Sequence, residues 1–222
     1  MNSFEKHQPV SLSQIVFAQP AVKQDLMDYA TGVATNNILL YGEFGTGKTT
    51  IAKAIANQRC NSEEVLLINA KSGVKLSLEK CRNHINWSLI NGDTPLFIVD
   101  EVDRFSANAQ DEIVCFLDEL KNYGGMLIFT TNYLDKVDKA LKSRCTPYNI
   151  KCLTPVQALP TAKQILSAEG VSYESDAWLL QQLELAVPAT SKASDWRAYG
   201  RQLDRIMRHS TKIKPPPKLR VV

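Results

Sequence analysis

A glycine-rich segment, YGEFGTGKTT at residues 41–50, constrains the fold of this chain more than any other feature. It contains Gly42-x-x-x-x-Gly47-Lys48-Thr49 and lies between an apolar run, NILLY at 37–41, and an amphipathic run, TTIAKAIANQ. Glycines let successive backbone N–H groups turn inward around phosphate oxygens, and a following helix adds the positive end of its dipole. The sequence therefore predicts a strand, a phosphate-binding loop and a helix, in that order.

This loop predicts a nucleotide site with a magnesium ion. We expect Lys48 to reach the β- and γ-phosphates and the Thr49 hydroxyl to hold Mg²⁺. ATP and Mg²⁺ are the cofactors that the pattern implies. The expected ATP-binding residues are Gly42, Glu43, Phe44, Gly45, Thr46, Gly47, Lys48, Thr49 and Thr50.

Polar residues that follow two further apolar runs add the groups needed for hydrolysis. The run PLFIV at 95–99 ends in Asp100 and Glu101. We expect Asp100 to share the Mg²⁺ with Thr49, and Glu101 to polarise an attacking water. Asn132 follows GMLIFTT at 125–131 and is predicted to orient water or the γ-phosphate. An asparagine that only ends a strand is the alternative for Asn132.

Apolar runs that alternate with amphipathic stretches indicate the fold class. The runs are not themselves alternating, which is typical of strands buried on both faces of a parallel sheet. They predict an α/β doubly wound domain that ends at residue 153. Helical patterns alone follow, so residues 154–210 are predicted to form a small all-helical domain, and 211–222 a basic, proline-rich tail. The five expected strands are 37–41, 65–69, 95–99, 125–131 and 148–153.

Composition excludes several other classes of protein. The five cysteines form no CxxC pair, so neither a zinc ribbon nor a disulfide framework is expected. The N-terminus is polar and no apolar run could span a membrane, which favours a cytoplasmic protein, in a host cytoplasm if the source is viral. Residues 192–222 carry nine lysines and arginines against two aspartates, which suggests contact with phosphates.

The order of these motifs, completed by the triplet Ser143-Arg144-Cys145, resembles the AAA+ ATPases of the clamp-loader branch, which open sliding clamps during DNA replication. The likeness covers residues 5–210 and is greatest to the ATPase subunits of large tailed-phage clamp loaders. It implies a P-loop AAA+ domain with a five-stranded parallel sheet over residues 1–153 and a helical lid over 154–210. Further similar stretches are 68–85, 102–120, 130–145 and 194–206.

The resemblance assigns roles to two arginines. Arg144 would be an arginine finger that contacts the γ-phosphate held by a neighbouring subunit, so other AAA+ subunits, identical or different, are expected partners. Such a finger neutralises charge in the transition state and contributes about 10³–10⁵ in rate. An ordinary surface salt bridge is the alternative for Arg144. Arg197 would be a second sensor that contacts the γ-phosphate within its own chain.

The resemblance also implies a sliding clamp and primer–template DNA as partners, with contacts to the DNA backbone rather than to its bases. Arg201, Arg205 and Arg208 continue one helical face from Arg197, and either phosphate contact or simple solvation would suit them. The candidate DNA contacts are Lys71, Ser72, Lys75, Arg82, Arg104 and Ser106.

The chain departs from the clamp-loader pattern at three places. Lys6-His7-Gln8-Pro9 occupies the position of the Lys-Tyr-Arg-Pro box of the family, and Glu43-Phe44 replaces the usual loop prolines. A C-terminal collar is expected to be missing. Two functions therefore remain open. One is an ATP-hydrolysing clamp-loader subunit. The other is an ATP-switched DNA-binding or assembly regulator, similar to a helicase loader, in which hydrolysis only resets self-association. The presence of Lys48, Glu101, Asn132 and Arg144 favours the first, because a pure switch could lose Glu101.

Overall fold

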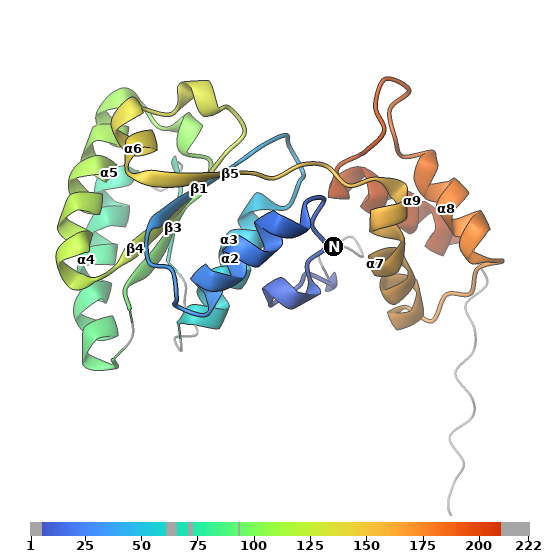
Figure 1. The fold of residues 1–222 in the computed structure, drawn as a ribbon, viewed down its shortest axis with the longest axis horizontal. Helices are drawn as coiled ribbons and strands as arrows, with labels where there is room; N and C mark the ends of the chain where they lie inside the picture. Colours follow the sequence, from blue (N-terminus) through green and yellow to red (C-terminus); the bar gives the residue numbers. More distant parts are fainter. Residues whose placement is uncertain (1–5, 61–65, 71–72, 93, 210–222) are drawn as a thin grey trace, which may run out of the picture. The chain divides into compact units, whose positions relative to one another are not determined.

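The computed structural model describes residues 6–60, 66–70, 73–92 and 94–209 of the chain (Figure 1). Contacts divide these residues into two compact units. The first comprises residues 9–151, and the second comprises the residues from 152 onward together with the N-terminal residues up to 8. The predicted basic tail at 211–222 lies outside the described residues, and the predicted domain limits at 153 and 210 stay predictions.

The first unit contains a five-stranded parallel sheet, as the sequence predicts. All strand pairs are parallel and lie in the order β2-β3-β4-β1-β5. Because parallel strands share one direction, their carboxyl ends all meet at one edge of the sheet. The phosphate loop leaves β1 at that edge. The strands are β1 (Asn37–Tyr41), β2 (Leu67–Ile68), β3 (Leu96–Val99), β4 (Met126–Thr131) and β5 (Cys145–Asn149).

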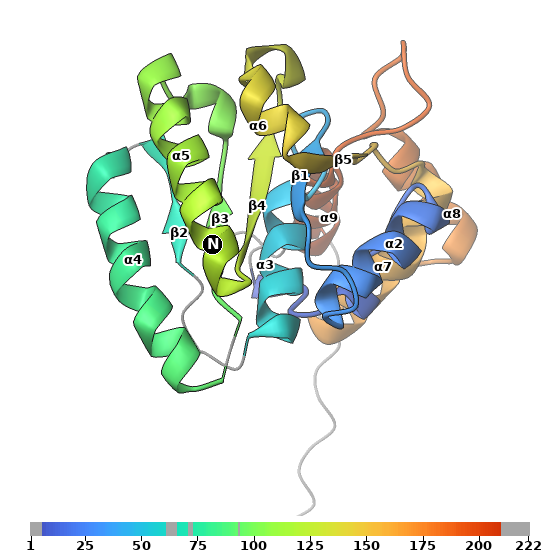
Figure 2. The ribbon, with the colours of Figure 1, turned by 60° about the vertical axis from the view of Figure 1, so that its left-hand side comes forward.

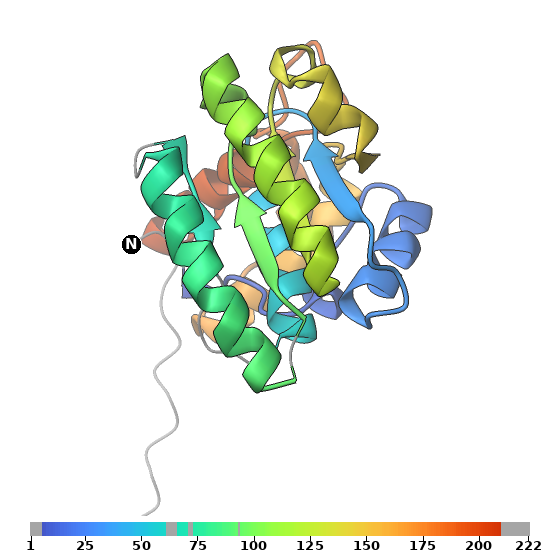
Figure 3. The same cartoon turned by 90° about the vertical axis from the view of Figure 1, so that its left-hand side faces the viewer.

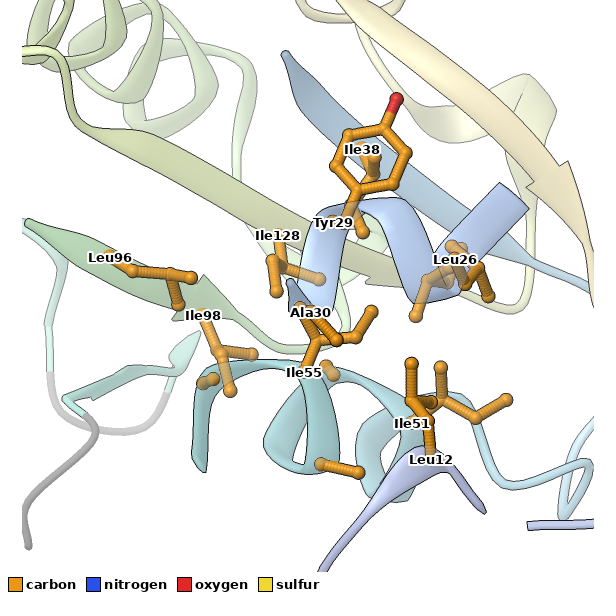
Figure 4. Close-up of a cluster of buried hydrophobic side chains, with 14 of the residues drawn as sticks. Leu12, Leu26, Tyr29, Ala30, Ile38, Ile51, Ile55, Leu96, Ile98 and Ile128 are labelled. Carbon is orange, nitrogen blue, oxygen red and sulfur yellow. The ribbon is translucent and has the colours of Figure 1, made fainter. Parts of the chain in front are cut away.

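Helices cover both faces of this sheet (Figures 2 and 3). The helices α2 and α3 pack on one face, and α4, α5 and α6 pack on the other. Successive strand side chains point to opposite faces, so Ile38 and Leu40 join the α2/α3 cluster (Figure 4) while Leu39 joins the other. The bounds are α2 (Pro20–Ala30), α3 (Lys48–Arg59), α4 (Val74–Ile90), α5 (Ala107–Leu120) and α6 (Lys139–Ser143), with short 3₁₀ turns η1 (Leu12–Gln14), η3 (Val102–Arg104), η4 (Lys121–Tyr123) and η5 (Leu134–Lys136).

One strand differs from its predicted position. The sequence predicts a last strand at 148–153, whereas β5 covers Cys145–Asn149. This strand pairs only with β1, so it lies at the edge of the sheet, where Pro147 is tolerated although it lacks an N–H donor. The apolar residues after it do not extend the strand. Instead the buried Ile150 donates its N–H to the Tyr41 carbonyl at 2.7 Å.

The second unit is all-helical, as predicted, with α7 (Pro155–Ala168), α8 (Asp176–Glu184) and α9 (Trp196–His209). A capping box of Thr154 and Gln157 begins α7. The buried ring of Tyr199 on α9 donates its hydroxyl to the Leu153 carbonyl at 2.7 Å. Lys6 and His7 belong to this unit because both contact the Glu169 carboxylate after α7, at 2.7 and 2.6 Å.

Two absences can be stated for the described part of the chain. None of its helices is long and apolar enough to cross a membrane. No group of three or more histidine, cysteine, aspartate or glutamate side chains is gathered there to hold a metal ion. All five cysteines are free thiols.

Candidate nucleotide-binding and hydrolysis site

The phosphate loop closes around the side chain of Lys48, the first residue of α3. This side chain is 6% exposed, and its Nζ donates to the carbonyl oxygens of Gly42 at 3.0 Å and Glu43 at 2.6 Å. The Thr46 hydroxyl lies 3.3 Å from the same nitrogen and donates to the Glu43 carbonyl at 3.0 Å. The loop therefore has the curled form that cradles phosphates, with a fixed cation in its centre.

Glycine is required in this loop for two physical reasons. Gly42, Gly45 and Gly47 have φ angles of 144°, 72° and 92°, which side chains of L-residues rarely adopt. In addition, a Cβ on Gly42 would lie 2.3 Å from the Ile150 carbonyl oxygen. The glycines that the motif predicts therefore have a demonstrable structural need in this chain.

A hydroxyl and a carboxylate lie together where the magnesium ion is expected. Thr49, on the first turn of α3, donates its Oγ1 hydrogen to Asp100 Oδ1 at 2.6 Å. Asp100 follows β3, whose carboxyl end lies at the same edge of the sheet as the loop, with β4 between β3 and β1. Carboxylate and hydroxyl oxygens suit Mg²⁺, a hard cation that prefers oxygen ligands. The donor set thus fits the ion, and Thr49 and Asp100 are the residues that would hold it.

The buried Thr130 of β4 links the two acidic residues. Its hydroxyl donates to Asp100 Oδ1 at 2.7 Å and accepts the Glu101 N–H at 2.9 Å. Sequence reasoning did not identify this residue. The available signal was a threonine pair at the end of an apolar strand, which is common in buried strands and carries little functional information.

Glu101 has an unusual backbone conformation. With φ 52° and ψ 53° it is the one non-glycine residue of the described chain in the left-handed region. Such a conformation costs on the order of 1–3 kcal/mol, and it clusters at functional sites. Its carboxylate Oε2 lies 3.0 Å from Arg104 Nε. Arg104, a candidate DNA contact, is therefore placed beside the candidate catalytic glutamate.

Asn132 lies at the end of β4, in a segment that Asp103 holds in place. Asp103 Oδ1 accepts the Thr131 hydroxyl at 2.6 Å and the Asn132 N–H at 3.2 Å. Asp103 belongs to the same turn as Glu101, so this aspartate fixes the backbone of Asn132 near the acidic pair. The Asn132 side chain is half-buried.

Aromatic packing ties the tip of the phosphate loop to Tyr133, the residue that follows Asn132. The Phe44 and Tyr133 rings meet edge to face, with centroids 5.7 Å apart and planes at 75°. Lys136 Nζ lies 4.3 Å from the Tyr133 ring centroid. Phe44, one of the two departures from the usual loop sequence, therefore braces the loop against the end of β4.

Arg144 lies far along the sheet from the phosphate loop of its own chain. It caps the C-terminal end of α6, and the next residue, Cys145, pairs with Asn37 at the start of β1. The phosphate loop begins after Tyr41 at the other end of β1, about 13 Å away at 3.3 Å per residue. Arg144 therefore lies at the amino ends of the strands, and the loop lies at their carboxyl ends.

The Arg144 side chain forms a forked salt bridge with Asp118 of α5. Its Nε donates to Asp118 Oδ1 at 3.0 Å and its Nη2 to Oδ2 at 3.1 Å. Its Nη1 donates to the Ala140 carbonyl at 3.2 Å. These bonds lower the pKa of the Asp118 carboxyl and raise that of the Arg144 guanidinium. Cys145 has a different character, because burial raises its pKa to about 12 and makes it a packing residue.

The candidate DNA contacts that the structure describes each have a partner within the chain. Lys75, near the start of α4, lies 3.8 Å from Glu112, and Arg82, two turns further on, bonds Glu119 at 2.9 Å. The Ser106 hydroxyl caps α5 by accepting the Ala109 N–H at 3.3 Å. Lys71 and Ser72 lie outside the described residues. Carboxylates of α5 thus already engage two of the candidate cations.

The arginines of α9 form one exposed face in the helical unit. Arg197, Arg201, Arg205 and Arg208 are all exposed, while Tyr199, Leu203 and Ile206 on the other side are buried. The helix therefore has the arrangement that its spacing predicts. The role of Arg197 as a second sensor stays a prediction.

Comparison with known proteins places this site in a family. Residues 38–150 match the ATPase family associated with various cellular activities (AAA). The chain belongs to this family. That segment spans β1 to β5 and contains the loop, the acidic pair and Arg144, so the features described above are those of an AAA ATPase domain.

Curated relatives of this AAA ATPase are replication proteins. It is 28% identical over 180 residues to the replication factor C small subunit of Thermofilum pendens, a match that covers 78% of this chain and 54% of the relative. It is 27% identical over 184 residues to mouse replication factor C subunit 5, covering 78% of this chain and 52% of the relative. The chain thus spans about half the length of the curated relatives it matches.

Solved structures support the fold. The Holliday junction branch migration motor RuvB of Thermotoga maritima superposes with a TM-score of 0.67 at 19% identity, covering 89% of this chain and 63% of that protein. DnaA of Aquifex aeolicus gives a TM-score of 0.64 at 17% identity, covering 90% and 66%. At these identities the similarity concerns the architecture of the AAA ATPase, which agrees with the predicted AAA+ fold.

Proposed function

We propose that this AAA ATPase is a subunit of a DNA-replication clamp loader, which uses ATP-driven assembly to bind and open a sliding clamp on primer–template DNA. The similarity to replication factor C small subunits supports a role in replication. The observation that carries the proposal is the position of Arg144, at the edge of the sheet opposite its own phosphate loop. An arginine so placed can serve the ATP of a neighbouring subunit but not its own.

Hydrolysis would use the residues gathered at the carboxyl edge of the sheet. Lys48 would hold the β- and γ-phosphates, and Thr49 and Asp100 would hold Mg²⁺, which supplies charge neutralisation when bound. Glu101 would polarise the attacking water, in an orientation fixed by Thr130 and Arg104. Asn132, from the adjacent strand end, would orient that water. Arg144 would come from the next subunit and Arg197 from the helical unit of the same chain.

An apolar surface on α4 is suited to the clamp. Trp87 and Ile90 are 65% and 81% exposed and lie three residues apart on the last helical turn, so they share one face. This turn leads into β3 and therefore lies at the amino edge of the sheet, away from the phosphate loop. Exposed large apolar side chains that adjoin each other mark protein-binding surfaces. A polyanion such as DNA would gain little there, whereas a folded clamp could bury both side chains.

Steady-state ATPase assays with primer–template DNA and the cognate sliding clamp test this function. We expect the clamp to stimulate turnover beyond the level with DNA alone, because the clamp would bind the assembled, hydrolysing state and so favour it. Changing Trp87→Ala together with Ile90→Ala should remove the clamp-dependent increment. Val10→Ala is a matched control, since Val10 is 63% exposed but lies outside this surface.

The opposite result would favour the second function. If DNA alone gives full stimulation and the clamp adds nothing, the chain is better described as an ATP-switched DNA-binding or assembly regulator. In that case the double variant at Trp87 and Ile90 would behave as the native protein does in every mixture.

A further inference from the structure

The forked salt bridge between Arg144 and Asp118 has a specific geometry. A guanidinium carries five N–H groups, one on Nε and two on each terminal nitrogen. The three hydrogen bonds of Arg144 use one N–H from each of its nitrogens: Nε and Nη2 to the Asp118 carboxylate, and Nη1 to the Ala140 carbonyl. The second N–H groups of Nη1 and Nη2 remain. The unused N–H of Nη2 lies on the far edge of the guanidinium plane, between Nη2 and Nη1, because the forked bridge occupies the edge between Nε and Nη2.

This far edge is the one that can contact a phosphate. Two parallel N–H groups match two oxygens of a phosphate, which is the bidentate mode in which arginine binds such groups. Within the described residues no acceptor is bonded to that edge, and the Arg144 side chain is 38% exposed. Asp118 therefore holds the side edge of the guanidinium and leaves its phosphate-binding edge open.

The backbone of Arg144 is fixed as well. Its N–H donates to the Leu141 carbonyl at 3.1 Å, which closes the last turn of α6. Its carbonyl accepts the Asn37 side-chain amide at 3.3 Å, and the same Asn37 side chain accepts the Leu127 N–H at 2.8 Å. The main chain is thus tied to β1 and, through Asn37, to β4. Asp118, on α5, is the group that fixes the long side chain beyond it.

We propose that Asp118 is a positioning residue for hydrolysis at the neighbouring subunit: it holds the Arg144 guanidinium edge-on so that its open edge faces the γ-phosphate across the subunit interface. This inference rests on the proposed role of Arg144 in trans. A long arginine side chain carries about 2 kcal/mol of rotamer entropy, and prior ordering by Asp118 removes much of that cost from the transition state. Misplacement of a catalytic group by 1 Å costs about 10²-fold in rate.

The experiment compares Asp118→Ala, Asp118→Asn and Arg144→Ala by steady-state ATPase in the presence of clamp and primer–template DNA. We expect Asp118→Ala to lower kcat by about 10²-fold with little change in KM for ATP, because the site that binds ATP keeps all of its own residues. Asparagine can accept from only one of the two N–H groups, so Asp118→Asn should be intermediate. Glu119→Ala is the matched control, since this adjacent carboxylate pairs with Arg82 instead.

Mixing subunits separates positioning from a general structural role. Glu101→Gln subunits lack the expected general base but keep both Asp118 and Arg144. Where an Asp118→Ala subunit holds ATP and a Glu101→Gln subunit faces it, a complete site is restored. The mixture should therefore turn over more than tenfold faster than either variant alone, as should a mixture that contains Arg144→Ala. Mass photometry of the same samples verifies that the variants assemble.

Each outcome has a distinct meaning. If Arg144→Ala loses turnover while Asp118→Ala keeps it, the positioning role is wrong and the trans arginine stands. If Asp118→Ala loses turnover and mixing does not restore it although the subunits assemble, Asp118 acts within its own subunit and the inference is wrong. If Arg144→Ala alone hydrolyses ATP at the native rate, the trans arginine of the proposed function fails.

Discussion

At the scale of single residues, one buried hydroxyl connects the groups expected to hold magnesium and to activate water. Thr130 both donates to Asp100 and accepts from the strained backbone of Glu101. A left-handed glutamate is stable only where neighbours hold it, and the bond from its N–H is such a constraint. The hydroxyl therefore ties the Asp100 carboxylate to the backbone of Glu101, the two residues for which we propose different tasks.

Thr130→Val tests this connection. Valine keeps the shape but leaves the Asp100 oxygen and the Glu101 N–H without this partner, a loss of about 1–3 kcal/mol. We expect kcat to fall by about one to two orders of magnitude, with a higher Mg²⁺ concentration needed for half-maximal activity. Magnesium titrations of ATPase activity measure both effects.

Thr130→Ser is the matched control, since serine retains the hydroxyl and should retain most of the activity. Native magnesium dependence in the valine variant would show that Thr130 is only a packing residue.

The sequence predicts residues of this site when they lie within one motif, and fails for contacts between distant segments. Lys48 and Thr49 are set by the spacing of the loop, and Asp100 and Glu101 by the end of an apolar strand. Thr130 and Asp118 carry no such signal, because their importance depends on which elements are neighbours. The contact of Asp118 with Arg144 spans 26 residues and requires α5 to lie beside α6.

At the scale of elements, the phosphate loop is supported from outside as well as by Lys48. Phe44 at its tip packs against Tyr133, which follows β4, and Tyr133 in turn contacts Lys136. Replacement of the usual prolines by Glu43-Phe44 removes a backbone restraint. The aromatic contact supplies another restraint in its place, so the loop and the end of β4 form one packed element.

Tyr133→Ala should loosen this loop. Loss of an edge-to-face pair costs about 0.5–1.5 kcal/mol. Because ATP binding would then have to order the loop, Kd for ATP should rise by about 2–10-fold. Fluorescence titration with a labelled ATP analogue measures the change. Tyr123→Ala is the control, since Tyr123 is exposed to the same degree, 43% against 42%, but lies in η4 after α5.

An equal loss of affinity in both variants would contradict a specific role for Tyr133. Unchanged affinity in the Tyr133 variant would show that Lys48 alone fixes the loop.

Elements were predictable where burial on both faces made them continuous apolar runs. The central strands β1, β3 and β4 lie within the predicted ranges, and α7, α8 and α9 follow the predicted helical patterns. The edge strand β5 was displaced by three residues at its start, because an edge strand is half-exposed and lacks that apolar signature. No sequence pattern predicted α2, which packs with α3 on one face of the sheet.

At the scale of the whole molecule, thiols and phenols with raised pKa values, Cys81, Cys145 and Tyr199 among them, lower the stability in alkaline solution. Burial raises the pKa of Cys81 and Cys145 from 9.0 to about 12, and that of Tyr199 from 10.0 to about 12. The thiols belong to the α/β unit and the phenol to the helical unit. In each case the folded state keeps a proton that the unfolded chain releases. Stability contributed by these groups is therefore complete below about pH 9 and is lost as the pH rises toward 12.

Urea unfolding from pH 8 to 10.5 under reducing conditions measures this effect. We expect the free energy of unfolding to fall steadily above pH 9. Cys81→Ala should be less stable at pH 8, because a packing group is lost, yet should show a shallower fall with pH. Cys115→Ala is the control, since that thiol is exposed, and should follow the native slope. A native slope in Cys81→Ala would exclude this thiol as a cause.

The close approach of Gly42 to the Ile150 carbonyl has a consequence for how such a chain can diverge. The first glycine of the loop is demanded by the neighbouring backbone as well as by phosphate. A descendant that no longer hydrolysed ATP would be free to replace Lys48 or Glu101, yet any side chain at position 42 would still collide with residue 150. In copies of this domain that have lost activity, a glycine retained at position 42 would therefore reflect only its close packing against residue 150. Lys48 and Glu101 would be the residues that indicate whether hydrolysis is retained.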